Sequence, residues 1–137
     1  METLKAGCVL VNTQTNCIGL IYREHLKDYT FPKGHLEEGE DLLTCAIRET
    51  AEETKRIAVV DINEDPYIEK YITPKGEHCI CYLYLAIDGG KSDNDSTDTH
   101  DLIWVPIDKV ENILSYQSIK DAWQVFKPRI KKLLSII

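Results

Sequence analysis

The sequence has no long hydrophobic run and is short of basic side chains. No apolar stretch approaches the roughly 20 residues that a membrane-spanning helix needs, so we expect no membrane segment. Lys and Arg number 16 against 23 Asp and Glu, which gives a net charge of −7. This balance argues against nucleic acid as a partner, because neutralising phosphates requires basic side chains. At 137 residues the chain is long enough to bury a core, and we expect one domain over residues 1–137.

The sequence also lacks a paired cysteine framework. Its five cysteines are an odd number, and residues 1–11 are too short and too lightly charged for a secretory leader. Both features favour a reducing, cytoplasmic location. His78, Cys79 and Cys81 lack the second ligand pair of a zinc site, and residues 93–98 lack the sixth-position glycine of a calcium loop. We therefore expect Cys79 and Cys81 to be packing residues of a strand.

What the sequence does contain is a run of glutamates at helical spacing in residues 40–54. At about 100° per residue, Glu49, Glu52 and Glu53 lie on one arc, which we expect to face solvent. The opposite arc is small and apolar enough to pack on a core, and it comprises Leu43, Ala46, Ile47, Thr50, Ala51 and Thr54. Three carboxylates at this spacing repel one another by about 0.2–0.5 kcal/mol per pair, so a hard divalent cation such as Mg²⁺ is a natural partner.

An ordinary solvated helix face is the alternative interpretation of this cluster. Such a face favours a basic residue four positions after each glutamate. Arg56 follows Glu52 at that spacing, but Glu49 is followed by Glu53. The cluster alone leaves both interpretations open, whereas the glycine-rich segment before the helix and the interval to Arg48 favour a metal site.

Residues 34–53, GHLEEGEDLLTCAIRETAEE, resemble the motif of the Nudix hydrolases, G-x5-E-x7-R-E-U-x-E-E-x-G-U, in which U is aliphatic. The match covers the first glycine and every charged position: Gly34, Glu40, Arg48, Glu49, Glu52 and Glu53. The departures are Thr50 at the first U, Lys55 at the motif glycine and Arg56 at the last U. The end of the helix is therefore expected to differ, with Ile57 as the buried residue.

The resemblance implies an α/β fold, a Nudix-type α/β/α sandwich with a mixed β-sheet. It also implies a metal-dependent hydrolase that cleaves a phosphoanhydride bond. Glu49, Glu52 and Glu53, with the Gly34 carbonyl, would hold Mg²⁺ or Mn²⁺ ions that neutralise phosphate oxygens and aim a water at phosphorus.

The catalytic roles follow from the same resemblance. Glu52 is the leading candidate for the general base, and Asp98 or Asp101 on a later loop could act instead. Arg48 would orient a glutamate of the cluster rather than touch substrate. Glu40 would brace the preceding turn or Arg48.

The segment P-K-G-H followed by E-x-G-E is similar to the asymmetric diadenosine tetraphosphate hydrolases of this family. That similarity implies phosphate contacts from Lys33 and His35, and an aromatic clamp for adenine at Tyr71. Stacking on an aromatic side chain contributes roughly 1–3 kcal/mol per base. The expected substrate is diadenosine tetraphosphate, cleaved to ATP and AMP.

Other substrates remain open at this point: nucleoside triphosphates, oxidised or not, nucleotide sugars and 5′-triphosphorylated RNA ends. A non-catalytic nucleotide-binding module is the alternative from another class, but such modules would be expected to lose motif carboxylates, and this chain keeps all of them. In each case the partner is a small nucleotide or a phosphorylated end, and the sequence specifies no oligomeric state.

The rest of the sequence predicts strands and helices around the acidic helix. Apolar and alternating stretches predict strands at residues 5–12, 17–23, 57–62, 66–73, 78–87 and 102–105. The first two should form a hairpin, residues 24–39 a loop, and residues 107–114 a short helix. A C-terminal helix has an apolar face made of Ile119, Ala122, Trp123, Phe126, Ile130, Leu133 and Leu134. Pro128 should kink that helix or restart it.

Overall fold

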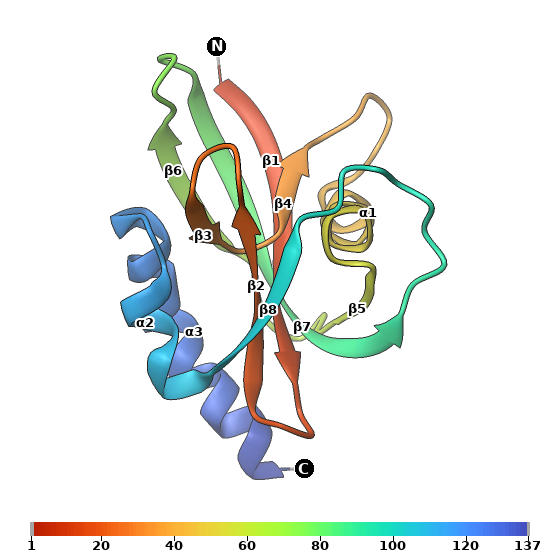
Figure 1. Ribbon diagram of the computed structural model, residues 1–137, viewed down its shortest axis with the longest axis vertical. Helices are drawn as coiled ribbons and strands as arrows, with labels where there is room; N and C mark the ends of the chain where they lie inside the picture. The colour runs from red at the N-terminus through yellow and green to blue at the C-terminus, as the bar shows by residue number, and fades with distance from the viewer. Residues whose placement is uncertain (1, 137) are drawn as a thin grey trace.

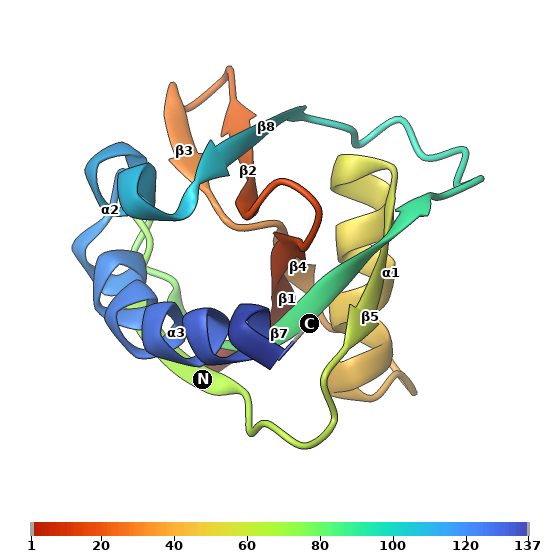
Figure 2. The same cartoon turned by 90° about the horizontal axis from the view of Figure 1, so that it is seen from below.

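The fold is built on a mixed β-sheet with helices on both faces (Figure 1). The computed structural model describes residues 2–136. Its strands are β1 (Glu2–Asn12), β2 (Cys17–Arg23), β3 (Asp28–Thr30), β4 (Lys33–His35), β5 (Arg56–Val60), β6 (Tyr67–Ile72), β7 (His78–Lys91) and β8 (Asp101–Pro106). Its helices are α1 (Leu42–Thr54), the 3₁₀ turn η1 (Ile107–Lys109), α2 (Val110–Ile113) and α3 (Gln117–Ile136). Because α1 covers one face and α2 and α3 the other (Figures 1 and 2), the predicted α/β/α sandwich is confirmed.

Two long strands, β1 and β7, lie at the centre of the sheet and run parallel, with Leu4 opposite Ile80 and Leu10 opposite Ala86. The other strand pairs within residues 2–136 are antiparallel. The outer edge of each long strand is shared by two short strands. β4 and β2 pair with successive segments of β1, and β6 and β5 pair with successive segments of β7. This division of the β1 edge brings β4 against α1.

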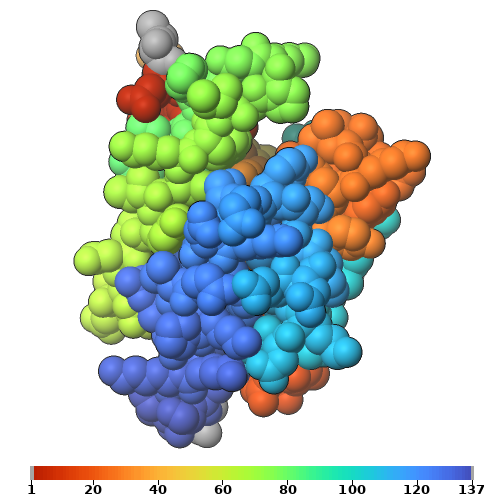
Figure 3. Space-filling view, turned by 90° about the vertical axis from the view of Figure 1, so that its left-hand side faces the viewer, coloured from red at the N-terminus to blue at the C-terminus, as the bar shows by residue number. Residues whose placement is uncertain are grey.

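The sheet is buried on both faces, as the apolar sequence of β7 predicts. Toward α3, the core includes Cys81, Leu83 and Leu85, which pack with Trp123 and Phe126. Figure 3 shows α2 and α3 covering this face. Toward α1, a smaller core contains residues with short side chains from β1, α1, β5 and β7: Ala6, Cys8, Cys45, Ala46, Ala58 and Ala86. Cys81 is fully buried, as expected of a packing residue, and burial raises the pKa of its thiol to about 12.

The buried arc of α1 differs from the predicted one. Its buried residues are Cys45, Ala46, Thr50 and Thr54. Ile47, predicted to be buried, is 36% exposed. Thr50 and Thr54 donate their hydroxyl protons to the Ala46 and Thr50 carbonyls, at 2.8 and 2.6 Å, so their burial leaves no hydroxyl unpaired. Small residues let α1 approach β1 closely, and the larger Ile47 lies at the rim.

Helix α3 runs unbroken through Pro128, so the predicted restart does not occur. Ile119, Trp123, Phe126 and Ile130 are fully buried and hold both halves of the helix on the sheet. Pro128 lies on the exposed side, where the carbonyl that loses its partner can bind water. None of the helices within residues 2–136 is long and apolar enough to cross a membrane.

The predicted strands and the short helix are confirmed, apart from details of their extent and burial. β1 begins at Glu2, before the predicted start at residue 5. The predicted loop at residues 24–39 contains β3 and β4, each of three residues, which is too short for a sequence period to reveal. β7 extends to Lys91, beyond the predicted end at residue 87. Ile57, predicted to be buried after the altered motif end, is 43% exposed, and Ala58 is buried in its place.

Candidate active site

Arg48 is the centre of a cluster formed by α1 and the segment before it. Its Nε donates to Glu40 Oε2 at 2.6 Å and its Nη2 to Glu40 Oε1 at 2.9 Å. Its Nη1 lies 2.8 Å from Glu49 Oε1 and 3.2 Å from both carboxylate oxygens of Glu52. Hydrogen bonding to Arg48 lowers the pKa of Glu40 to about 2. The guanidinium therefore fixes the orientation of three motif glutamates at once.

Gly34 lies in β4 directly beneath the Glu49 carboxyl group. A Cβ atom at this position would overlap that carboxyl group, so the approach of the side chain to the β4 backbone requires glycine. The Glu49 side chain is 14% exposed, and its burial raises the pKa of the carboxyl group above its usual range, with Arg48 opposing the shift. A charged Glu49 next to β4 thus needs a compensating positive charge.

Glu53 is not on the solvent-facing arc where we expected it. Its Oε1 accepts a hydrogen bond from the Lys33 backbone N–H at 2.8 Å, and the side chain is only 12% exposed. Burial raises its pKa to about 8, although the Lys33 hydrogen bond opposes the shift. The cause is β4, which pairs with β1 and passes over the last turns of α1. His100 Nε2 lies 3.6 Å from Glu53 Oε2 on the other side.

The donor set fits a hard divalent cation. Glu49, Glu52 and Glu53 supply carboxylate oxygens, and two of them are buried enough that their pKa values rise. A bound cation would stabilise the charged form of both. Within residues 2–136 no three acidic, histidine or cysteine side chains are arranged to enclose one ion, and Arg48 Nη1 instead bridges Glu49 and Glu52. The assignment of metal ligands, including the Gly34 carbonyl, stays a prediction.

Lys33 and Tyr71 lie together, but the Lys33 side chain points toward Glu69 of the sheet. Lys33 Nζ lies 3.3 Å from Glu69 Oε1 and 4.3 Å from the centre of the Tyr71 ring. Glu69 is 2% exposed and accepts a second hydrogen bond, from Ser118 Oγ at 2.6 Å. Because the lysine covers the Tyr71 ring, an adenine could stack on that face only after Lys33 moved. The Tyr71 hydroxyl is buried and has no hydrogen-bond partner within residues 2–136.

The other predicted residues lie around the carboxylates. His35 is exposed at the end of β4, and its carbonyl accepts a hydrogen bond from Arg48 Nη2 at 3.0 Å. Asp98 is close enough to contribute to the raised pKa of Glu49. Asp101 is the first residue of β8 and pairs with Tyr22 of β2. Which of the two alternative bases acts stays a prediction.

Sequence reasoning missed Glu69 and His100. Glu69 had a signal, since it lies between Tyr67 and Tyr71 at the inward positions of β6, where a carboxylate is unexpected. His100 had none, because its place beside Glu53 depends on the path of a loop without regular structure.

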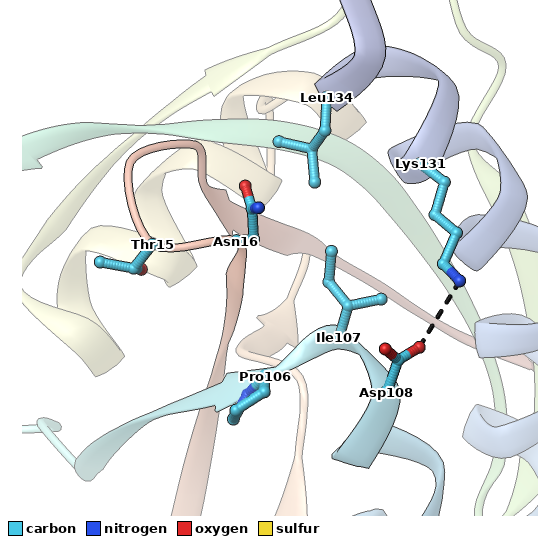
Figure 4. A pocket seen from close by; sticks show the side chains of 7 residues that line it. All are labelled: Thr15, Asn16, Pro106, Ile107, Asp108, Lys131 and Leu134. Atoms are coloured by element: carbon cyan, nitrogen blue, oxygen red, sulfur yellow. Dashed lines mark ion pairs between the residues drawn. The ribbon is translucent and has the colours of Figure 1, made fainter.

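A surface pocket of about 370 Å³ lies elsewhere (Figure 4). It is lined by the β1–β2 turn, the β8–η1 junction and α3: Thr15, Asn16, Pro106, Ile107, Asp108, Lys131 and Leu134. Figure 4 shows Leu134 and Ile107 pointing into it and an ion pair between Lys131 and Asp108, at 3.5 Å. None of the predicted site residues lines it.

The chain matches the family model of the NUDIX domain over residues 1–126. It is 31% identical over 113 residues to an 8-oxo-(d)GTP phosphatase of Mycolicibacterium smegmatis, covering 82% of this chain and 34% of that protein. It is also 31% identical over 121 residues to a putative mutator protein MutT4 of Mycobacterium tuberculosis, covering 86% of this chain and 48% of that protein. The chain thus spans about a third and about half of the length of these two curated relatives.

Solved structures share the fold over nearly the whole chain. A C. elegans Ap4A hydrolase superposes with a TM-score of 0.77 at 23% identity, covering 95% of this chain and 99% of that one. A NUDIX-family hydrolase from Clostridium perfringens superposes with a TM-score of 0.74 at 16% identity, covering 96% and 97%. At these identities the likeness concerns the fold.

Proposed function

The chain belongs to the Nudix family, and from this membership we propose that it hydrolyses a phosphoanhydride bond in a nucleoside polyphosphate. Members of the family generally need a divalent metal ion such as Mg²⁺ or Mn²⁺. The observation that supports the proposal most is the carboxylate helix ordered by Arg48, with Gly34 admitting Glu49 to the β4 backbone. We propose that the chain acts as one domain, on a small nucleotide, in the cytoplasm.

The chain's own residues hold and orient the reacting groups. When bound, a divalent ion neutralises phosphate oxygens and makes a water more acidic. Glu49, Glu52 and Glu53, with the Gly34 carbonyl, supply the hard oxygen donors that such an ion prefers. Arg48 donates to Glu49 and Glu52 and thereby sets the direction in which their free oxygens point.

Glu52 is the proposed proton acceptor for the attacking water. Its side chain is 22% exposed, more than those of Glu49 and Glu53, and it is held by Arg48 from one side only. A carboxylate that is oriented and still reaches solvent can accept a proton and release it. Asp98 is the alternative acceptor, since its charge acts on Glu49.

The substrate we propose first is diadenosine tetraphosphate, cleaved to ATP and AMP. The support is the segment of residues 32–40, in which Lys33 and His35 stand immediately before the carboxylate helix. Tyr71 is the proposed adenine partner, with the rearrangement of Lys33 described above.

A second candidate substrate class has its own support. Two relatives at 31% identity bear the names of an 8-oxo-(d)GTP phosphatase and a mutator protein, which favours nucleoside triphosphates, oxidised or not. The same carboxylate helix could serve this reaction, because both substrates present a phosphoanhydride to the same metal-binding oxygens.

A substrate panel tests the proposal. Dinucleoside polyphosphates, nucleoside triphosphates including 8-oxo-dGTP, nucleotide sugars and 5′-triphosphorylated RNA are each incubated with Mg²⁺ and with Mn²⁺. We expect metal-dependent turnover of diadenosine tetraphosphate that gives ATP and AMP but no ADP. Reaction in ¹⁸O-labelled water then places the label on one product and identifies the attacked phosphorus.

The outcomes separate the candidates. ADP as the main product, or turnover of a nucleoside triphosphate alone, replaces the substrate and keeps the hydrolase. Binding of nucleotides without turnover under any metal identifies a non-catalytic module and overturns the proposed function.

A further inference from the structure

Lys55 occupies the position where the family motif has glycine, and it keeps the backbone conformation that glycine favours. Its φ and ψ are 61° and 28°, in the left-handed region, and its N–H donates to the Ala51 carbonyl at 3.0 Å to end α1. A side chain is disfavoured in this conformation, because Cβ crowds the following carbonyl. The lysine side chain must therefore gain contacts that a glycine could not make.

Those contacts are with the loop of residues 92–100, which joins β7 to β8. The Lys55 ammonium donates to the Asn94 carbonyl at 2.7 Å and to the Ser96 carbonyl at 2.6 Å. The Lys55 carbonyl accepts from the Ser92 N–H at 2.9 Å. One residue thus binds the loop with both its main chain and its side chain. Figures 1 and 2 show this loop passing beside α1.

The far end of the loop is attached to the last turn of α1. The His100 N–H donates to the Glu53 carbonyl at 2.9 Å, and Thr99 Oγ1 to the Glu52 carbonyl at 3.2 Å. Carbonyls in the last turn of a helix have no partner within the helix, so the loop supplies what they lack. The loop is therefore hydrogen-bonded to the end of α1 that carries the proposed metal ligands.

This attachment places the His100 side chain beside the carboxylates. His100 Nε2 lies 3.6 Å from Glu53 Oε2, and its ring stacks on that of His25 with centres 6.0 Å apart. The Asp98 charge acts on Glu49 from the same loop. Both interactions depend on where residues 92–100 lie relative to α1.

We infer that Lys55 is a positioning residue for the hydrolysis, whose ammonium holds residues 92–100 so that His100 stands at a fixed position beside Glu53. The inference rests on the proposed function for its catalytic part. The lysine acts through the loop and touches neither substrate nor metal.

The test compares two lysines that share a backbone conformation. Lys55→Gly keeps the left-handed turn and removes the ammonium. Lys27→Gly is the matched control, because Lys27 also has a positive φ, of 51°, and its ammonium makes no hydrogen bond or ion pair within residues 2–136. Lys55→Arg keeps a long, positively charged side chain with N–H donors for the two loop carbonyls. For each variant, amide hydrogen exchange of residues 92–100 is measured together with kcat and KM for the nucleotide that the substrate panel identifies.

We expect exchange in the loop to rise by about tenfold or more in Lys55→Gly, with no change in Lys27→Gly and partial recovery in Lys55→Arg. We expect kcat to fall by about tenfold in Lys55→Gly while KM changes less than about threefold, because the loss concerns geometry in the transition state. Unchanged loop exchange in Lys55→Gly overturns the inference. So does a loosened loop with unchanged kcat, which would make Lys55 a structural anchor alone. Exchange is read without turnover, so a wild-type protein that is inactive on every substrate overturns the proposed function separately.

Discussion

Glu40 and Arg48 form a two-point ion pair, with nitrogen–oxygen distances of 2.6 and 2.9 Å. Glu40 comes from the segment before α1 and Arg48 from the helix itself. Because the same guanidinium also contacts Glu49 and Glu52, the position of Glu40 determines where two metal-binding candidates point. Paired hydrogen bonds from a planar guanidinium fix direction as well as distance.

Replacing Glu40 with Gln should therefore disturb catalysis, although Glu40 itself does not contact the substrate. We expect Glu40→Gln to lower kcat by roughly 10–100-fold, the usual loss when a residue that orients metal ligands is removed. Substrate KM should change little. Steady-state kinetics at saturating Mg²⁺ measures both quantities, and a large rise in KM with unchanged kcat would contradict the positioning role.

The same pair predicts a pH dependence of stability. Arg48 lowers the pKa of Glu40 to about 2, below the value of about 4.3 expected in the unfolded chain. The folded state therefore binds fewer protons in this range, so the stabilisation is complete above about pH 5 and is lost as the pH falls toward 2. Urea unfolding at pH 6 and pH 3 should show a larger loss for the wild type than for Glu40→Gln. Equal losses would mean that the pair does not contribute to acid stability.

The approach of Glu49 to Gly34 gives a second prediction. Gly34→Ala introduces a Cβ that overlaps the Glu49 carboxyl group. We expect a loss of about 1–3 kcal/mol in the free energy of unfolding, typical of overpacking, and a fall in kcat of at least roughly 100-fold. Chemical denaturation and kinetics measure the two effects.

A double variant identifies the cause. If the overlap with Glu49 is responsible, Gly34→Ala should cost little stability in a Glu49→Ala background, because the obstructing carboxyl group is gone. A cost that is the same in both backgrounds would place the conflict in the β4 backbone instead.

How much of this site the sequence predicts depends on which contacts are local. Glu49 and Glu52 share an arc with Arg48 because of the helical period, so their proximity follows from spacing alone. The burial of Glu53 does not follow from spacing, because the strand that buries it, β4, has only three residues and no sequence period reveals it. Lys33 likewise pairs with Glu69, 36 residues away, and only the register of the sheet brings them together.

The turn at the end of α1 shows the same limit. Lys55 and Arg56 depart from the family motif, and the sequence predicts only that the helix end changes. The structure gives each a partner far along the chain: the loop carbonyls for Lys55, and Asp88 for Arg56, at 2.9 and 2.6 Å. Arg56 at the last aliphatic position is therefore compatible with the fold because β7 supplies a carboxylate beside it.

The burial of Glu53 predicts an unusual response to pH in the absence of metal. Its folded pKa, about 8, lies above the unfolded value of about 4.3, so the folded state binds the proton more tightly. Stability in EDTA should therefore fall as the pH rises from about 4.5 to 8. Glu53→Gln should remove this slope and melt at a higher temperature than the wild type at pH 8. Thermal melts in EDTA at pH 5 and pH 8 measure the difference.

Metal reverses the expectation. With Mg²⁺ or Mn²⁺ in excess, the charged carboxylate gains a partner, and the wild type at pH 8 should be stabilised while Glu53→Gln responds less. The variant should also lose several orders of magnitude in turnover. Undiminished turnover with saturating substrate and Mg²⁺ would remove Glu53 from the metal site.

The last prediction separates the two roles open to Lys33, a phosphate contact and a partner of the buried Glu69. Glu69 is 2% exposed, so Lys33→Ala leaves a buried carboxylate without its cation and should cost roughly 3 kcal/mol of unfolding free energy. His35 is exposed, and His35→Ala should change stability by less than about 0.5 kcal/mol. Both variants should lose more kcat/KM on diadenosine tetraphosphate than on a diphosphate compound, if each binds a phosphate beyond the scissile bond.

Combining Lys33→Ala with Glu69→Gln decides between the roles. Neutralising Glu69 removes the unpaired charge, so the double variant should recover most of the stability that Lys33→Ala loses, while Ser118 can still bond the amide. If Lys33 contacts a phosphate, the double variant cannot recover that contact along with its stability, because it has no ammonium at position 33. Stability that recovers together with full kcat/KM on the long polyphosphate would therefore assign Lys33 to the sheet alone. Stability that recovers without kcat/KM would show that the ammonium leaves Glu69 and Tyr71 when substrate arrives, which also frees the ring for a base.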